Sequence, residues 1–468
     1  MKVLIRIVLS AILLWVPAMA AQPNILFIMV DDLNAEVGFL GDPKAKTPNM
    51  DRLAAKSVIF NKAYCQAPIC GPSRNSMLTG RYPHNTGLYS LYPLFSDVDE
   101  LKNIVALPHH FRNNGYWSAS AGKIYHSKPA PQSFDTNAGW HGGFGPFPQK
   151  PIHLSANLNV HPFYDWGAYL VDEETTDYKV AQSAINYIKQ AASQQKPFFI
   201  SAGFFRPHCP LYVPQRWFDL HPLDKIAALP DQSSDMSDIS GYAKKLVSYF
   251  GNQSYNRFLH DSNHTAAFQQ AYRACVSYVD HCIGMVLNEL EKSGQANNTI
   301  VIIAGDNGMQ NGQKNLWWKR TLWEASTQVP LLIKPLGVLS GNTVASPVGL
   351  IDLYPTLCDL TGLAHPNGLE GHSLTGLMRG ETTKRNPALS SFGPGNFALR
   401  SERWRYIRYA DGSEELYDHQ KDSKEMTNLA LNPEFSSILA EFRPMVPKES
   451  KPFAPGSKDL GSNAFPNE

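Results

Sequence analysis

Pairs of acidic and amide side chains stand directly after two strongly apolar segments of the sequence. Asp31 and Asp32 follow "NILFIMV", and Asp306 and Asn307 follow "TIVIIAG". These side chains offer oxygen ligands without thiolate or imidazole, a set that suits a hard divalent cation. Ca²⁺ is favoured over Mg²⁺ because several protein ligands are supplied at once. One such aspartate would more often cap a helix, but two pairs closing separate strands predict a metal site.

A second group of side chains is cationic or can become so. Its members are Arg74, Lys123, His126, His208 and Lys319. A single loop histidine is more often structural than catalytic. Gathered around a metal ion, however, these groups would form a pocket for a tetrahedral oxyanion, where charge developing on transferred and leaving oxygens is stabilised. The residues alone therefore predict a metal-assisted hydrolase of sulfate or phosphate esters.

Cys70 lies in "PICGPSRNSMLTGR" (68–81), which predicts a short helix from Pro72 to the glycine at position 80. A cysteine at a helix N-terminus beside an arginine is placed where negative charge is favoured. A disulfide, a metal ligand, a nucleophile and a precursor of another group are all open for it at this point. With six cysteines in 468 residues the chain is not a disulfide scaffold, and Cys275 and Cys282 are expected in the core.

Continuous apolar runs that end in polar residues are typical of strands buried on both faces of a parallel sheet. Such runs span 23–32, 196–208 and 298–308, with a shorter one in 117–126, and helical patterns cover 180–191 and 272–290. This alternation predicts an α/β fold with a mostly parallel central sheet and helices on both faces. Since ligands bind beyond the carboxyl ends of parallel strands, we expect the polar residues, Arg206 among them, to gather along one edge.

Both ends of the chain carry separate signals. Residues 1–20 combine early positive charges, a short apolar run and a small-residue cleavage pattern, which predicts a secretory signal, no membrane anchor, and a periplasmic or secreted enzyme. The catalytic domain is expected over 21–385. Residues 386–468 are expected to form a small α+β subdomain with an antiparallel sheet, since 403–418 alternates around Asp411-Gly412 and an amphipathic stretch follows near Phe435. The net charge of +1 argues against a nucleic-acid partner.

The segment "CGPSRNSMLTGR" resembles the Cys-x-Pro-Ser-Arg signature of the formylglycine-dependent sulfatases, members of the alkaline-phosphatase-like superfamily. Within this family, "LFIMVDDLNAEVGFLGD", "GKIYH", "RPHCP" and "LWWKRTLWEASTQVPLLI" most resemble the iduronate-2-sulfatase branch. The resemblance covers nearly the whole chain. It implies that a sulfatase-maturing enzyme oxidises Cys70 to formylglycine (3-oxoalanine), and that the substrate is a sulfated poly- or oligosaccharide.

The resemblance also implies a role for each matching position. Ca²⁺ would be held by Asp31, Asp32, Asp306, Asn307 and the oxidised residue 70. Arg74 and Lys123 would steady the aldehyde hydrate, and Lys123 with Lys319 would hold sulfate oxygens. His208 would protonate the departing sugar oxygen, and His126 would take a proton from the hydrate. One hydroxyl of the hydrate attacks sulfur and the other later expels sulfate, an exit that a plain thiol lacks.

Two departures limit what the resemblance implies about the substrate. The iduronate-2-sulfatases carry Asp-His where this chain has Asp306-Asn307, and Met309 and His84 also differ, so iduronate specificity is not carried over. Sugar subsites could instead be formed by His84, Tyr89, Tyr92, Trp140 and His141, although such aromatic residues often only pack. The alternatives are a phosphate mono- or diesterase of the same superfamily, and a sulfated-glycan binder whose Cys70 is not matured.

Overall fold

The computed structural model describes residues 22–458 except 155–161, 195, 228, 230–231, 251–252, 338–340 and 382–384. Within this part of the chain, an eight-stranded sheet forms the centre of the fold, in the order β12-β2-β11-β9-β1-β7-β4-β5. Its strands are β1 (Asn24–Val30), β2 (Val58–Phe60), β4 (Trp117–Gly122), β5 (Thr136–Asn137), β7 (Phe198–Phe204), β9 (Thr299–Gly305), β11 (Leu331–Lys334) and β12 (Thr343–Val344). The four apolar runs thus form β9, β1, β7 and β4, which lie side by side and parallel.

One strand departs from the parallel arrangement. β11 pairs antiparallel with both β9 and β2, so the sheet is mixed at that side. Because β11 runs antiparallel to β9, the long connection 306–330 between them does not need to include a crossover helix. The predicted α/β fold with a mostly parallel sheet is confirmed.

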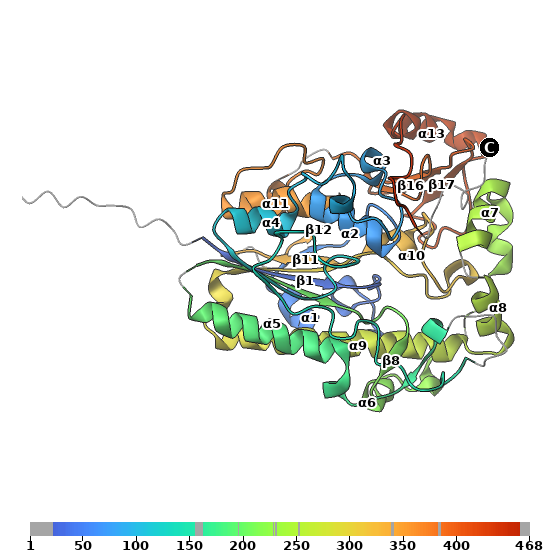
Figure 1. Ribbon diagram of the computed structural model, residues 1–468. Coiled ribbons are helices and arrows are strands. Elements are labelled where there is room, and N and C mark those ends of the chain that lie inside the picture. The colour runs from blue at the N-terminus through green and yellow to red at the C-terminus, as the bar shows by residue number, and fades with distance from the viewer. Residues whose placement is uncertain are drawn as a thin grey trace, which may run out of the picture.

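Helices cover both faces of the sheet (Figure 1). They are α1 (Pro48–Ala54), α2 (Cys70–Thr79), α3 (Pro83–Thr86), α4 (Leu107–Asn113), α5 (Thr176–Ala192), α6 (Gln215–Asp219), α7 (Gly241–Phe250), α8 (Gln253–Asp261), α9 (Thr265–Lys292), α10 (Glu324–Thr327), α11 (Leu353–Thr361), α12 (Thr375–Met378) and α13 (Ser436–Phe442). Alternate residues of β1 enter two different cores. Leu26 and Ile28 pack with α5 and α9, whereas Ile25 and Phe27 pack with α2, α4 and α11. Burial on both faces explains why these strands are apolar throughout.

The helix that carries Cys70 begins earlier than predicted. α2 starts at Cys70 itself, two residues before Pro72, because a proline within the first turn removes no intrahelical hydrogen bond. It ends as predicted at Gly80, whose φ of 67° is the left-handed conformation that glycine favours. Cys275 and Cys282 lie in the core on α9, as expected.

The C-terminal part forms a four-stranded antiparallel sheet of β14 (Ala388–Ser391), β15 (Phe397–Arg400), β16 (Trp404–Arg408) and β17 (Glu414–Asp418), against which α13 packs. Two smaller sheets join β3 (Ala63–Tyr64), β10 (Gln328–Val329) and β13 (Val348–Gly349), and β6 (Trp166–Ala168) with β8 (Leu211–Val213). The antiparallel C-terminal sheet was predicted, and the domain division at residue 385 stays a prediction.

Residues 1–20, where the secretory signal was predicted, lie outside the described residues. In the part of the chain that is described, none of the helices has the length and apolar character needed to cross a bilayer.

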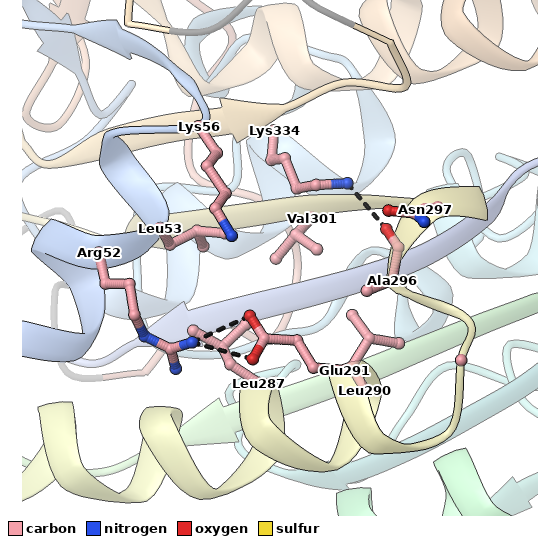
Figure 2. Close-up of a pocket in the computed structure, with 11 residues that line it drawn as sticks. Arg52, Leu53, Lys56, Leu287, Leu290, Glu291, Ala296, Asn297, Val301 and Lys334 are labelled. Atoms are coloured by element: carbon pink, nitrogen blue, oxygen red, sulfur yellow. Dashed lines mark hydrogen bonds and ion pairs between the residues drawn. The ribbon is translucent and has the colours of Figure 1, made fainter.

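A cavity of about 380 Å³ lies near the amino end of β9, away from the edge where the polar residues were expected (Figure 2). Three of the four charged side chains that line it have hydrogen-bond partners. Arg52 donates to both carboxylate oxygens of Glu291, and the Lys334 ammonium donates to the carbonyl of Ala296 at 2.8 Å. The charged side chains Arg52, Glu291 and Lys334 of this cavity are therefore already engaged.

Candidate active site

The predicted polar residues meet at the carboxyl ends of the four parallel strands. Backbone hydrogen bonds continue the ladder just beyond the strands: Asp31 N–H donates to the Phe204 carbonyl at 3.0 Å, and Asp306 N–H donates to that of Val30 at 3.2 Å. Ligand-type atoms of Asp31, Asp32, Cys70 and His208 all lie within 4.8 Å of one another. The convergence expected from the strand order is present.

Arg74 bridges two of the strand ends from α2. Its Nε donates to Asp306 Oδ2 at 2.7 Å, and its Nη2 lies 3.4 Å from Asp31 Oδ1. Its Nη1 binds the backbone carbonyls of Lys123 and Ile124. The side chain is 1% exposed. Because each of its three nitrogens is bound to a carboxylate or a backbone carbonyl, Arg74 supports the carboxylates and the β4 end.

Two buried lysines complete the charge balance around Cys70. Lys123 Nζ lies 2.5 Å from Asp31 Oδ2, and Lys319 Nζ contacts Asp32 Oδ1 and lies 3.2 Å from Cys70 Sγ. Although burial opposes ionisation of Asp31, Lys123 brings the pKa of its carboxyl below the usual value. The three carboxylates of Asp31, Asp32 and Asp306 are thereby matched by three buried cations.

The Cys70 thiol differs electrostatically from the other five. Burial would raise its pKa, but Lys123 and Lys319 overcome this effect and hold the pKa well below the ordinary value. Burial raises the pKa of each remaining thiol, namely those of Cys65, Cys209, Cys275, Cys282 and Cys358. Position 70 is therefore built to carry negative charge.

Two buried oxygens in this cluster have no hydrogen-bond partner within the described part of the chain. They are Asp32 Oδ2 and Asn307 Oδ1. The Asn307 amide nitrogen is occupied, since it donates to Asp32 Oδ1 at 2.7 Å. Unpaired buried oxygens are costly unless something binds them. A hard cation held by oxygen ligands would satisfy both.

The two predicted catalytic histidines face the cluster from different strands. His208 is fixed by its Nδ1, 2.7 Å from the Cys209 carbonyl, so its Nε2 points inward and lies 3.6 Å from Asp32 Oδ2. Burial lowers the pKa of His126 despite a hydrogen bond to Cys70. His126 is thus neutral at neutral pH and able to accept a proton.

The proposed sugar-subsite residues fall in different places. Tyr92 is 42% exposed and its ring packs edge-on against His126 at 5.4 Å, so it lies at the rim of the cluster. The structure does not bring His84 and Tyr89 to the cluster. They are buried against the C-terminal part, where His84 packs on Phe397 and the Tyr89 hydroxyl donates to the Lys451 carbonyl.

Trp140 and His141 also lie outside the cluster. Trp140 packs on Phe144 and Phe205, and it reaches His208 only through the Phe144 ring. His141 hydrogen-bonds Ser183 on α5 at 2.9 Å.

Several residues around the cluster were not predicted. Phe144, Phe163 and Trp318 place their rings 4.6, 5.4 and 6.3 Å from that of His208. Ser73 donates to the Asp306 carbonyl and so ties α2 to the end of β9. Trp318 adjoins Lys319 and Ser73 lies inside the Cys70 motif, so proximity in the sequence was the available signal for both. Arg206 was expected at the cluster but forms no ion pair with it among the described residues.

Two family models match the chain. The family model for sulfatases matches residues 23–363, and a model for the C-terminal part of N-sulphoglucosamine sulphohydrolase matches residues 312–451. The chain belongs to the sulfatase family. It is accordingly a sulfuric ester hydrolase, and the cluster around Cys70 is the candidate active site of this sulfatase.

Individual relatives agree with this assignment. A sulfatase of Formosa agariphila is 37% identical over 443 residues, which cover 91% of this chain and 87% of that protein. Human iduronate 2-sulfatase is 28% identical over 394 residues, which cover 73% of this sulfatase and 70% of the human enzyme. A solved 2-O GAG sulfatase superposes with a TM-score of 0.71 at 24% identity, covering 91% of each chain, and shows the same fold.

Proposed function

We propose that this sulfatase hydrolyses sulfate esters of carbohydrates, using a formylglycine made from Cys70 and a bound Ca²⁺. The observation that carries the proposal is the environment of Cys70. Its thiol lies 3.2 Å from a buried lysine, within a charge-balanced group of carboxylates, and inside the family's signature segment. The carbohydrate class is supported by the likeness to iduronate 2-sulfatase.

Calcium fits the residues that would hold it. Asp31, Asp32, Asp306 and Asn307 would be its protein ligands, together with residue 70. Asp32 Oδ2 and Asn307 Oδ1 are the buried oxygens without partners, and the oxygen-only donor set suits a hard cation. When bound, the ion would draw charge from the sulfate oxygens and so stabilise the transition state.

Formylglycine fits position 70 for the same electrostatic reason that the thiol is acidic there. The hydrated aldehyde would supply two hydroxyls on one carbon, one to attack sulfur and one whose deprotonation releases sulfate. Lys123 and Lys319, which lower the pKa of the thiol, would favour the ionised form of a hydroxyl at the same place. Arg74 would hold the Asp31 and Asp306 carboxylates in position beneath it.

The two lysines and the two histidines would have separate roles in the reaction. Lys123 and Lys319 would hold sulfate oxygens as negative charge builds on them. The His208 Nδ1 is engaged by a backbone carbonyl, so its inward Nε2 would deliver a proton to the departing sugar oxygen. His126, kept neutral by burial, would take the proton whose removal releases sulfate.

We also propose that the enzyme is exported and matured by a formylglycine-generating enzyme. The first 20 residues have the pattern of a secretory signal, and the Cys70 segment has the pattern that the maturing enzyme reads. On this view the catalytic domain spans 21–385 and the subdomain 386–468.

The substrate class is tested with paired esters and with sulfated sugars. The sulfate and phosphate esters of one phenol should be hydrolysed with a clear preference for sulfate, and a screen of defined sulfated oligosaccharides should release sulfate from some members. Cys70→Ala should remove turnover without loss of folded structure. A preference for the phosphate ester would support the phosphatase alternative, and substantial activity of Cys70→Ala would refute the mechanism.

A further inference from the structure

We propose that Arg206 positions the leaving-group acid His208, although its own guanidinium stays out of the reaction. The inference rests on the role proposed for His208 above. Arg206 is the second residue after the end of β7, and it is 5% exposed. A buried arginine needs partners for its donors, because an uncompensated charge in the interior is strongly unfavourable.

The partners of Arg206 are backbone carbonyls from three segments. Its Nε donates to the Tyr212 carbonyl at 3.2 Å, its Nη2 to that of Phe144 at 3.1 Å, and its Nη1 lies 3.5 Å from that of His208. Among the described residues it forms no ion pair with a carboxylate, in contrast to Arg74. The guanidinium of Arg206 therefore holds chain segments together. Its charge also acts on Asp177: burial raises the pKa of that carboxyl, and Arg206 offsets part of this effect.

These segments carry the groups that surround the acid. The Phe144 ring lies 4.6 Å from the His208 imidazole, and Lys123 Nζ lies 4.8 Å from the centre of the same ring. Phe144 thus contacts both the acid and a lysine proposed to hold sulfate. The Arg206 guanidinium binds the backbone carbonyls of both Phe144 and His208. It thereby determines how the His208 imidazole packs against the Phe144 ring.

The backbone of Arg206 is itself anchored. The buried Asp177 of α5 accepts the N–H of Phe205 at 2.7 Å and that of Arg206 at 2.9 Å. The arginine is therefore fixed at both its backbone and its guanidinium. A lysine could not replace it fully, because a single ammonium group on a flexible side chain cannot bind three carbonyls in the way that the planar guanidinium does.

The test compares substrates whose leaving groups differ in their need for a proton. Arg206→Lys and Arg206→Met are assayed beside His208→Ala with an alkyl sulfate and with 4-nitrophenyl sulfate. We expect Arg206→Met to lower kcat/KM for the alkyl sulfate by about 10²-fold, as for a displaced catalytic group. The aryl sulfate should lose only about threefold, since its leaving group needs little protonation. Arg206→Lys should fall between Arg206→Met and the parent enzyme.

A double variant separates positioning from general loosening of the fold. If Arg206 acts through His208, Arg206→Met combined with His208→Ala should show no greater alkyl-to-aryl difference than His208→Ala alone. Arg216→Met, which removes a 60% exposed arginine of the nearby α6, is the control and should keep the parent's ratio of alkyl to aryl activity. Should Arg206→Met fail to fold, Arg206→Lys and Asp177→Asn decide the question by the same ratio.

The outcomes distinguish this inference from the role of His208. If His208→Ala is selectively defective on the alkyl sulfate while the Arg206 variants lose both activities equally, positioning by Arg206 is refuted and the acid role stands. Multiplicative losses in the double variant would refute it as well. An unselective defect in His208→Ala would refute the acid role, and the inference with it.

Discussion

Lys319→Met removes the charge closest to the proposed nucleophile, and its effect can be worked out from the geometry. Lys319 Nζ lies 3.2 Å from Cys70 Sγ, and the side chain is 2% exposed, so solvent does not screen it. Two full charges at that distance interact by about 5 kcal/mol at an effective dielectric constant of about 20. If about half a charge changes at the reacting group, the transition state loses about 2.5 kcal/mol, or about 10²-fold in rate.

This magnitude agrees with what the loss of one charge-stabilising donor costs in other active sites, about 10²- to 10³-fold in kcat. The substitution keeps a chain of similar length, and Asp32 Oδ1 retains the Asn307 amide as a donor at 2.7 Å. Because the variant still leaves the buried Asp32 carboxylate without its lysine, the melting temperature is compared with that of the parent enzyme to show that the variant is folded. We expect kcat to fall by about two orders of magnitude and KM to rise, because Lys319 would also hold a sulfate oxygen.

The assay is steady-state release of sulfate, with the state of residue 70 measured by mass spectrometry on the same sample. Equal conversion in parent and variant shows that the loss lies in the reaction and not in maturation. Lys334→Met, at the cavity on the opposite edge of the sheet, is the matched control and should be fully active (Figure 2). Activity of Lys319→Met close to that of the parent, with residue 70 fully converted, would refute the electrostatic reasoning.

Three further outcomes are expected. Chelation of Ca²⁺ should abolish activity, and added Ca²⁺ should restore it. Asp306→Asn should need a higher Ca²⁺ concentration than the parent enzyme for half-maximal activity. Full activity after exhaustive chelation would exclude the metal's role. Since burial lowers the pKa of His126, base catalysis should persist below pH 6.5 and fail only on further acidification, and His126→Ala should lose that acidic limb of the pH–rate profile. Burial brings the pKa of His84 to about 4, so on acidification the unfolded state binds a proton before the folded state does. The free energy of unfolding should therefore fall from about pH 6.5 toward pH 4. If His84→Gln shows the same dependence of this free energy on pH as the parent, the reasoning is contradicted.

The strand ends of the active site could be predicted because burial on both faces leaves a visible pattern. Continuous apolar runs identified β1, β7 and β9, and the polar residues that close them meet because parallel strands share a carboxyl edge. Asp31 follows β1 and Lys123 follows β4, and β7 lies between these two strands. The two side chains therefore meet at the same edge of the sheet. The antiparallel β11 was not predicted, since a four-residue apolar strand carries no sign of its direction.

The sugar-subsite residues could not be predicted in the same way, because their surroundings come from distant parts of the chain. His84 and Tyr89 are covered by Phe397 and by the segment around Lys451, more than 300 residues away. Arg206 illustrates the same point. Its place after a buried strand suggested that it would join the polar residues at the sheet edge, but the carbonyls of Phe144 and Tyr212 determine where its guanidinium lies.

The central claim, that position 70 carries an aldehyde in the working enzyme, is tested most directly by mass spectrometry of protein from its native host. Trypsin should release residues 63–74, which contain Cys65 and Cys70. We predict a peptide about 18 Da lighter than the unmodified sequence, the change on oxidation of a cysteine to an aldehyde, with one thiol left to alkylate. A fully active enzyme whose peptide has the unmodified mass and two alkylated thiols would contradict the account.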